Sequence, residues 1–339
     1  MPVVVRDIGR ELKKLWQQNE GATRASLVNL AVYSEKPDSL ERNTQLVSEL
    51  TENLACRAIV IAADPHPTQN HVEAWISAHC HVSRAGSKQI CSEQISFRLE
   101  GPCTSLLPNI VFAHLDSDLP LYLWWEDELH DPIDPQLWSW VDRLIYDSHD
   151  WKDVAQQLAL VETAQQQARQ RVILCDLNWT RLYRIRLALA QFFDHPASHR
   201  HFASISSVEI SYAPTFRSTA FLLIGWIAAQ LGWKFQTGKD HDLSFHDRNR
   251  RLIRASVKER AGAPIGQISL FTKEVEFRIV HREKSDLLEV SRGRPGLAGT
   301  PQLLPAEGNE TVRLVADELM RGGPHKVYQN ALRSIRALL

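Results

Sequence analysis

The pattern of hydrophobic and polar positions differs between the two halves of the chain. In the first half, short apolar runs alternate with segments of helical spacing, which is typical of an α/β sheet. Residues 26–35 and 56–64 predict buried strands, and the apolar spacing over residues 40–54 predicts the helix between them. Asp38 and Glu41 resemble a capping box at the start of that helix. This βαβ unit predicts two parallel strands with a right-handed crossover.

A hairpin follows, because VEAWISAHCHV and ICSEQISFRL each place most of their apolar side chains on one face. With a turn near Ala85 and Gly86, Cys80 and Cys91 would lie nearly opposite each other. Cβ atoms of cross-strand neighbours are about 4.5–5.5 Å apart, which is slightly long for a relaxed disulfide. Cys80 and Cys91 are therefore redox candidates. The alternative is that both thiols are buried as small hydrophobic side chains.

The rest of the chain extends this two-part pattern. Apolar strands are predicted at residues 119–125 and 143–148, with a further candidate at 172–176. In the second half, residues 218–233 are apolar on nearly all sides, which predicts a buried helix. Residues 251–279 alternate as antiparallel strands do, because Val275, Phe277 and Ile279 share one face.

These patterns predict two domains. Residues 1–175 should form an α/β domain with a mixed, largely parallel sheet and a hairpin. Residues 176–339 should form an α+β domain with an antiparallel meander. The length of 339 residues agrees with two domains of ordinary size.

Composition narrows the class of protein. Hydrophobic residues make up 44% and charged residues 23%, as in an ordinary globular protein. The 39 basic and 40 acidic residues give a net charge of −1, so charge does not favour nucleic acid or an anionic membrane as a partner. We expect a cytoplasmic protein, because we find neither a spanning segment nor a secretory signal. Five widely spaced cysteines without a C-x-x-C motif do not form a secreted disulfide framework.

Common catalytic signatures are missing from the sequence. We find no dinucleotide-binding glycine motif, P-loop, nucleophile elbow or H-E-x-x-H motif, so we predict no catalytic residue, cofactor or metal. Ser148, His149 and Asp150 are adjacent and cannot form a triad, because neighbouring side chains point apart. Acids end several predicted strands: Asp64, Glu126, Asp127 and Asp147. They most simply cap helices or start turns, and the alternative is a sugar-phosphate sensor or enzyme that uses these acids.

Histidines and one carboxylate in the hairpin have plain structural interpretations. His79 and His81 should share a solvated strand face with Cys80 opposite, which matches no standard zinc module. Glu93 lies on an apolar face and should need an ion-pair partner, for which Arg57 or Arg143 is available.

Two other features suggest a protein partner. Residues 246–260 carry several cations, which suit an acidic partner surface, although a solvated strand face is the default interpretation. Ten tryptophans are present, and tryptophan serves both in interfaces and in cores. The partner-binding candidates are therefore Trp124, Trp125, Arg248, Arg250, Arg251 and Arg254.

Several segments resemble a known family. They are CSEQISFRLEG, LPNIVFAHLDSDLPLYLWWEDE, DRLIYDS, DLNWTRLYRIRLALAQFFD and FLLIGWIAAQLGW. Together they are similar to the OpcA family, the assembly proteins of glucose-6-phosphate dehydrogenase, over most of residues 25–335. The resemblance implies a non-enzymatic assembly factor and allosteric activator that favours the active dehydrogenase oligomer and supports NADPH production in the oxidative pentose phosphate pathway. In cyanobacteria it further implies redox control by thioredoxin. The resemblance assigns no catalytic residue and no redox cysteine.

Overall fold

The computed structural model describes the chain except residues 18–21, 37, 83–88, 131–134, 168–171, 195, 240, 298, 322, 324, 337 and 339, and except the side chains of Ala22, Cys103, Thr104, Phe112, Pro196, Ala197, His199 and Lys239. It divides into two compact units, each built from three stretches of the chain. Unit 1 comprises Met1–Tyr146, Gln156–Cys175 and Val315–Pro324, and unit 2 comprises Asp147–Ala155, Asp176–Leu314 and His325–Leu339. The domain boundary expected between residues 175 and 176 stays a prediction.

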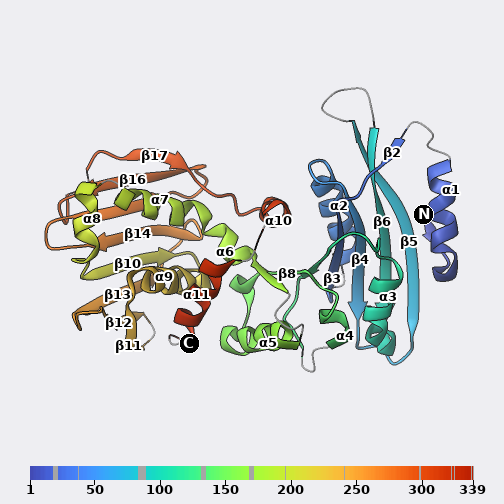
Figure 1. Ribbon diagram of the computed structural model, residues 1–339, viewed down its shortest axis with the longest axis horizontal. Helices are drawn as coiled ribbons and strands as arrows, with labels where there is room; N and C mark the ends of the chain where they lie inside the picture. The colour runs from blue at the N-terminus through green and yellow to red at the C-terminus, as the bar shows by residue number, and fades with distance from the viewer. Residues whose placement is uncertain are drawn as a thin grey trace. The chain divides into compact units, whose positions relative to one another are not determined.

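Unit 1 contains a nine-stranded mixed sheet (Figure 1). Its order is β1 (Pro2–Val3), β5 (His71–Val82), β6 (Gln89–Glu100), β4 (Cys56–Asp64), β3 (Val28–Ser34), β7 (Leu121–Trp125), β8 (Arg143–Tyr146) and β9 (Ile173–Asp176), and β2 (Ala22–Arg24) pairs with β6. The central strands β6, β4, β3, β7 and β8 are parallel to one another, whereas β5 is antiparallel to β6. The predicted α/β class, with its parallel strand pair and its hairpin, is confirmed.

Helices pack against this sheet and bury its central strands. They are α1 (Ile8–Gln17), α2 (Ser39–Thr51), α3 (Leu107–Ala113), α4 (Pro135–Trp138) and α5 (Val154–Gln167). Every residue of β3 is buried, as expected for a parallel strand with both faces covered. Asp38 precedes α2 as expected, but its side chain makes no capping hydrogen bond, so the predicted capping box was wrong.

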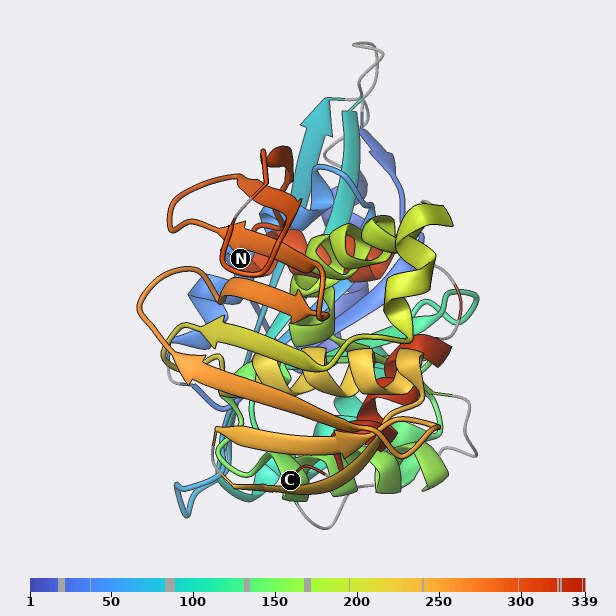
Figure 2. The same cartoon turned by 90° about the vertical axis from the view of Figure 1, so that its left-hand side faces the viewer.

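Unit 2 contains an eight-stranded sheet, and Figure 2 shows its strands from β16 and β17 at the top to β11–β13 at the bottom. The order is β11 (Lys234–Lys239), β12 (Asp242–His246), β13 (Leu252–Glu259), β10 (Ser207–Tyr212), β14 (Ile265–Phe271), β15 (Glu276–His281), β16 (Leu287–Gly293) and β17 (Gln302–Pro305). Strands β14 to β17 form the predicted antiparallel meander. The sequence patterns did not predict β10, which lies parallel to β13 and separates it from β14.

The helices of unit 2 include the long apolar one that the sequence predicts. They are α6 (Leu177–Arg181), α7 (Tyr183–Asp194), α8 (Pro196–Phe202), α9 (Arg217–Leu231) and α11 (Lys326–Ile335), with the short helix η3 (Ser148–Asp150), while α10 (Thr311–Met320) has residues in both units. Helix α9 packs against α11, and Gly225 allows the close approach, because a Cβ there would lie 3.0 Å from the Ala331 carbonyl oxygen. No helix within the described ranges has the length and apolar character to cross a membrane.

Candidate functional site

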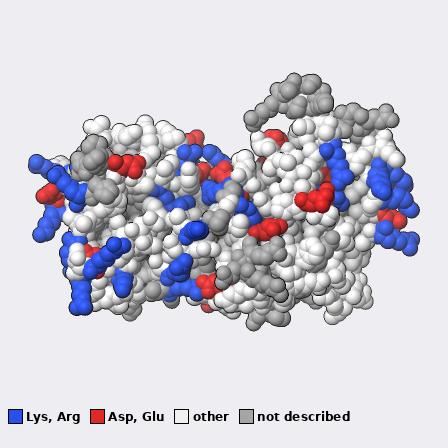
Figure 3. Space-filling view, in the orientation of Figure 1, with Lys and Arg blue, Asp and Glu red and all other residues white. Residues whose placement is uncertain are grey.

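The first candidate site is a basic hairpin edge in unit 2, formed by Arg248, Arg250, Arg251 and Arg254, which are all exposed. In Figure 3, blue side chains outnumber red ones at the left-hand end, where Figure 1 shows α8 and β10–β13. The turn between β12 and β13 is rigid, because Asp247 Oδ1 accepts hydrogen bonds from the backbone N–H groups of Asn249 and Arg251. The structure thus presents these cations on an ordered edge.

Neighbouring charges divide these four arginines. Arg251 Nε donates to Asp247 Oδ2 at 2.7 Å, and its Nη2 contacts both Asp247 and the Ala203 carbonyl. Desolvation acts to raise the pKa of Asp247, but backbone and side-chain hydrogen bonds from Arg251 outweigh it and hold the pKa below its ordinary value. Arg251 is therefore partly neutralised, and Arg248, Arg250 and Arg254 remain as the candidates for a partner's acidic surface.

The tryptophan candidates do not belong to this surface. Trp124 and Trp125 have exposed fractions of 2% and 9%, so the expectation that they form an exposed contact was wrong. Trp125 stacks on Tyr33 with ring centroids 4.1 Å apart and lies near Trp138. Both indoles are buried although they point to opposite faces of β7, because both faces of this parallel sheet are covered. Trp140, with an exposed fraction of 59%, is the most exposed tryptophan in the described part of the chain, where Trp16, Trp75 and Trp226 are half-buried.

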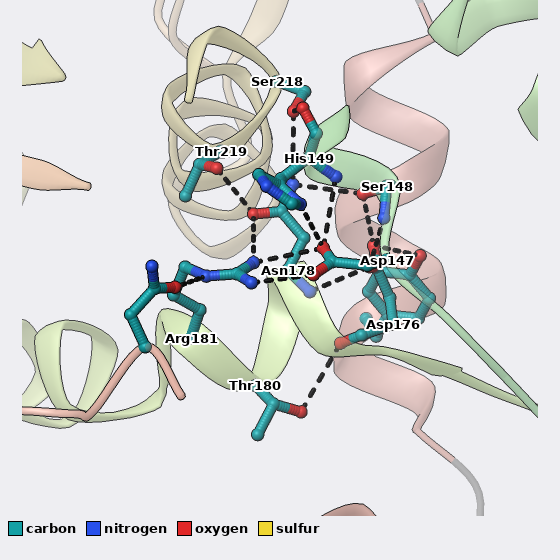
Figure 4. A network of polar contacts seen from close by, with 11 residues as sticks. Asp147, Ser148, His149, Asp176, Asn178, Thr180, Arg181, Ser218 and Thr219 are labelled. Carbon is teal, nitrogen blue, oxygen red and sulfur yellow. Dashed lines mark hydrogen bonds and ion pairs between the residues drawn. The ribbon is translucent and has the colours of Figure 1, made fainter. Parts of the chain in front are cut away.

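The second candidate site is a buried polar network in unit 2 (Figure 4). It brings together side chains from the start of η3, from α6 and from α9, together with Tyr328 of α11. Asn178 is its centre: its Oδ1 accepts from Thr219 Oγ1 at 2.6 Å and its Nδ2 donates to Ser148 Oγ at 3.1 Å. Polar groups buried this completely need such partners, so the network fixes the packing of these helices.

A paired aspartate and arginine form one end of the network. Arg181 donates to both carboxylate oxygens of Asp147, through Nη1 at 3.1 Å and Nη2 at 2.7 Å, and its Nε contacts Asn309. Burial raises the pKa of Asp147, but hydrogen bonding from His149 and the charge of Arg181 outweigh it and hold the pKa well below its ordinary value. Asp147 is therefore an anion that neutralises a buried guanidinium.

A second aspartate forms the other end. Asp176 is fully buried and accepts hydrogen bonds from the backbone N–H groups of Ser148 and Asn178, from Ser148 Oγ at 2.7 Å and from the Tyr328 hydroxyl at 2.8 Å. Burial and the nearby charge of Asp147 raise its pKa to about 6, although the hydrogen bonds act in the opposite direction. Two carboxyl groups of one network thus have pKa values displaced in opposite directions.

The geometry gives the Ser–His–Asp tripeptide no catalytic arrangement. Ser148 Oγ donates to Asp176, and the His149 ring lies 2.9 Å from Asp147 and stacks on Phe216. A hydrolytic triad requires a hydrogen bond between the nucleophile and the base. The interpretation that these neighbouring residues do not form a triad agrees with this geometry.

The third candidate site is a disulfide in unit 1. Cys80 and Cys91 are directly opposite in the β5–β6 register, and their sulfur atoms are bonded with Cα atoms 4.1 Å apart. The expected turn near Ala85 and Gly86 lies outside the described residues. Cys91 is fully buried, whereas Cys80 is partly exposed. The two redox candidates are therefore brought together, and Cys80 is the residue of the pair that is partly exposed.

Glu93 lies two residues from the disulfide and is almost completely buried. Arg24 Nη2 lies 3.1 Å and Arg57 Nη1 3.5 Å from its Oε2, and Trp16 Nε1 donates to its other oxygen. Arg143, the alternative partner expected from the sequence, instead donates to Cys175 Sγ at 3.6 Å. Glu93 thus connects β6 with β2, β4 and the end of α1.

The acidic strand ends of unit 1 are occupied by neighbouring groups. Glu126 Oε2 accepts from Arg42 and Asn43, both at 2.7 Å, and Asp127 accepts from the backbone N–H of Glu35 at 2.7 Å. Asp64 accepts from the backbone N–H of His66 at 3.0 Å. These contacts favour the interpretation of turns and ion pairs over an acid–base site.

The hairpin histidines each have a local partner. His79 Nε2 lies 2.8 Å from Gln94 Oε1, and His81 Nε2 lies 3.1 Å from Thr51 Oγ1. Burial lowers the pKa of His79, which favours its neutral form. With Cys80 in a disulfide, these residues do not converge on one point as metal ligands do.

The sequence patterns indicated the cysteine pair but not the buried network. The sequence predicts Asp147 at the end of a strand, and Asp176 is the last residue of β9. Nothing local to either residue indicates that Thr219, Asn309 and Tyr328 close around them. Aspartates at the ends of two successive predicted strands are the one signal that the sequence offers.

Solved structures that match this chain have very low sequence identity to it. An aldose-aldose oxidoreductase from Caulobacter crescentus has 8% identity, a TM-score of 0.49 and coverage of 92% of this chain and 95% of that one. An oxidoreductase from Bacillus cereus has 9% identity, a TM-score of 0.48 and coverage of 92% and 94%. Similarities this low carry no argument about fold or function.

Two curated cyanobacterial proteins are more informative. Both bear the name OxPP cycle protein OpcA. The Synechocystis protein is 27% identical over 84% of this chain and 63% of its own length, and the Synechococcus elongatus protein is 24% identical over 79% and 64%. The chain thus spans less than two thirds of the length of these relatives.

Family models cover most of both halves of the chain. The model described as the glucose-6-phosphate dehydrogenase subunit N-terminal domain matches residues 47–163. The model described as the C-terminal domain of the same subunit matches residues 173–332. The two matches follow each other in the order that their descriptions give, and they agree with both curated relatives. The chain belongs to the OpcA family.

Proposed function

We propose that this protein binds glucose-6-phosphate dehydrogenase, promotes its assembly into the active oligomer and activates it allosterically without catalysing a reaction itself. The carrying observation is the pair of adjoining family matches, described as the two domains of a glucose-6-phosphate dehydrogenase subunit, over residues 47–163 and 173–332. The names of the cyanobacterial relatives place those proteins in the OxPP cycle. The activated enzyme would supply NADPH in the oxidative pentose phosphate pathway.

The polar groups of the chain support a non-catalytic role. Ser148 is held by Asp176, and the carboxylates at the strand ends are held by Arg42, Asn43 and backbone N–H groups. These hydrogen bonds would have to break before the groups could act on a substrate. Activation then depends on a difference in affinity between two states of the dehydrogenase, because an effector shifts an equilibrium only by binding one state better.

The basic hairpin edge is the proposed contact surface. Arg248, Arg250 and Arg254 are exposed, and the Asp247 hydrogen bonds hold the adjoining turn in one conformation. The ordered backbone fixes where these arginines leave the turn, and the planar guanidinium group suits bidentate pairing with carboxylates. The proposed complementary surface on the dehydrogenase is acidic.

The Cys80–Cys91 disulfide is the proposed redox element. A dithiol such as reduced thioredoxin would attack the partly exposed Cys80 sulfur and release Cys91 as a thiolate. The second thiol of the reductant then resolves the mixed disulfide, so that two electrons and two protons pass to the protein and the reductant becomes a disulfide. The support is geometric: the bond joins β5 to β6, and Glu93 next to it connects β6 to β2, β4 and α1.

The test mixes the purified chain with glucose-6-phosphate dehydrogenase from the same organism. NADPH formation is recorded across glucose 6-phosphate concentrations, with size-exclusion chromatography alongside. Co-elution together with a lowered half-saturation concentration is expected, by a factor of roughly 5–150 if the coupling is typical. Separate elution and unchanged kinetics, in both oxidising and reducing buffer, would contradict the proposal.

Variants separate the surface from the redox element. Arg248→Glu, Arg250→Glu and Arg254→Glu combined should abolish co-elution. The matched control reverses three exposed cations elsewhere: Arg6→Glu, Lys13→Glu and Arg333→Glu. Cys80→Ser with Cys91→Ser should make activation independent of dithiol; if the variant keeps the redox response of the wild type, these cysteines are not the switch.

A further inference from the structure

Unit 2 contains an open cavity that neither the family nor the proposed function accounts for. Its volume is about 580 Å³, within the range of about 300–1,000 Å³ that small-molecule sites occupy. It lies where the end of α8, the start of β10, the start of β13 and the turn between β14 and β15 meet.

Cations from three separate segments line this cavity. Arg200 comes from α8, Arg251 from the β12–β13 turn and Lys273 from the β14–β15 turn, and all three are exposed. Glu274, also exposed, is the one carboxylate among the described lining residues. With Arg251 partly neutralised by Asp247, Arg200 and Lys273 still outnumber Glu274, so the lining favours an anion, although the net charge of the whole chain is −1.

The walls of the cavity are ordered by hydrogen bonds. Arg251 is held by Asp247 and by the Ala203 carbonyl. Thr272 Oγ1 donates to the Val275 carbonyl at 3.1 Å and accepts from the Val275 N–H at 2.8 Å, which fixes the turn that carries Lys273. Such a site is organised before its ligand arrives and loses little entropy on binding.

Hydroxyl and apolar groups complete the lining. Ser204 and Ser206 present hydroxyl groups that donate to backbone carbonyls, so their oxygens remain available as acceptors. Ile205 and Ile253 are buried behind them, and Leu252 is 44% exposed. This combination suits a ligand with an anionic group and a compact polar body that has apolar faces, as a sugar ring has.

We infer that this cavity binds a phosphomonoester of the size of a sugar phosphate. Arg200 and Lys273 would pair with the phosphate oxygens, and the serine hydroxyls and Leu252 would contact the sugar. The ligand site uses cations of unit 2, whereas the acidic strand ends that first suggested a sugar-phosphate sensor are already paired. The inference stands on the cavity alone and does not require the dehydrogenase as a partner.

The test is calorimetric titration of the purified wild-type chain, with glucose 6-phosphate as the probe. Saturation at one site per chain is expected, and the variant Arg200→Gln with Lys273→Gln should bind at least about tenfold more weakly, because it loses two charge-assisted hydrogen bonds to the phosphate. The matched control Lys258→Gln with Arg260→Gln removes two exposed cations that do not line the cavity. Its affinity should stay within about twofold of the wild type.

Two further titrations identify the source of the anion. Glucose tests the sugar alone and inorganic phosphate tests the anion alone, and both should bind more weakly than the ester. Equal affinity for inorganic phosphate and the ester would show that the sugar contributes nothing to binding. The cavity would then be a site for free phosphate, and the assignment to a phosphomonoester would be overturned. Equal affinity of the double variant and the wild type, or no saturation up to about 10 mM ester, would overturn the site itself. Thermal melting of each variant shows that a lost affinity does not come from a lost fold.

Discussion

Two aspartate–arginine pairs of unit 2 have the same chemistry but differ in the burial of the arginine. Arg181 donates twice to Asp147, and Arg251 donates twice to Asp247. The Arg181 side chain is 6% exposed, whereas the Arg251 side chain is 50% exposed. The aspartates differ in the other direction, at 23% for Asp147 and 10% for Asp247, so the contrast lies in the guanidinium groups. Asp147 joins η3 to α6, which are far apart in sequence, whereas Asp247 and Arg251 belong to one turn.

The difference between the pairs predicts that burial, rather than bond length, decides how much an ion pair contributes to stability. An exposed pair is screened by water and contributes little to stability. A buried pair costs desolvation when it forms, but the loss of one partner leaves a charge without compensation. The Asp147–Arg181 pair should therefore be essential to the folded state, and the Asp247–Arg251 pair should mainly shape a turn.

Removal of the buried charge should have the largest effect. Asp147→Asn leaves the Arg181 guanidinium buried without a counterion, and the free energy of unfolding should fall by about 3–5 kcal/mol. Urea denaturation followed by tryptophan fluorescence measures this change. A loss as small as that of the exposed pair would show that Asn309 and Asn178 compensate for the missing carboxylate.

The pH dependence of Asp176 should have the next largest effect. Its pKa is raised from 3.8 to about 6, so its contribution to stability is present below pH 3.8 and is lost as the pH rises through 6. Asp176→Asn has no such charge, and between pH 4 and pH 8 the wild type should lose about 2–3 kcal/mol of stability relative to this variant. Urea denaturation of both proteins across this range measures how the free energy of unfolding depends on pH. The altered hydrogen bonds of the amide shift that free energy by the same amount at every pH and so do not change its slope. Parallel pH profiles would contradict the raised pKa.

The pKa of Asp147 has the opposite sign and acts in another pH range. Because its folded pKa is held below the ordinary value, its contribution to stability is present above that value and is lost as the pH falls below it. The two aspartates therefore act at different ends of the acidic range, and Asp147 stays ionised in the folded protein throughout the Asp176 measurement above pH 4.

A smaller effect is expected at the exposed turn. Arg250 has a φ of 61°, in the left-handed region that favours glycine. Arg250→Gly should therefore stabilise the protein, by about 1 kcal/mol at most. Arg248→Gly removes the same charge from the same turn and should destabilise it slightly, because Arg248 is not among the residues with positive φ. Chemical denaturation of both variants measures the difference, and equal effects would refute the argument from backbone strain.

The smallest effect should come from the exposed counterpart of the buried pair. Asp247→Asn keeps an oxygen that accepts from the Asn249 and Arg251 N–H groups. Water solvates the exposed Arg251 guanidinium after its counterion is lost. The melting temperature should stay close to that of the wild type at physiological salt. A loss comparable to that of Asp147→Asn would show that the turn, and not burial, is the important difference between the two pairs.

Local patterns predicted most of the unit 1 sheet and the cysteine pair. Residues 56–64 are β4 as expected, and the alternation of the two hairpin strands correctly predicted Cys80 opposite Cys91. Alternation of apolar and polar residues with a period of two predicts a strand, and the register of a hairpin follows from that period together with the turn. These properties are contained within a single short stretch of the chain.

Some local predictions were wrong because local patterns do not report what covers a strand. Trp124 and Trp125 belong to a strand that was correctly predicted, yet both are buried. Because they are adjacent in a strand, their side chains must point to opposite faces of the sheet. This does not reveal whether helices cover one face or both. Strand β10 was missed for a related reason, since its position between β13 and β14 depends on a parallel partner far along the chain, with Ser207 opposite Arg254.

By itself, the sequence determined the α/β and α+β classes, the strands of unit 1, the position of the cysteine pair and the resemblance to the OpcA family, because periodicity, turns and family motifs are contained in short stretches of the chain. Only the tertiary structure decided which charged groups are buried and which converge on one cavity. Asp176 meets Tyr328 across 152 positions, and Arg200, Arg251 and Lys273 reach one cavity from three segments. Contacts of this kind depend on how distant elements pack, and hydrophobic periodicity carries no information about that packing.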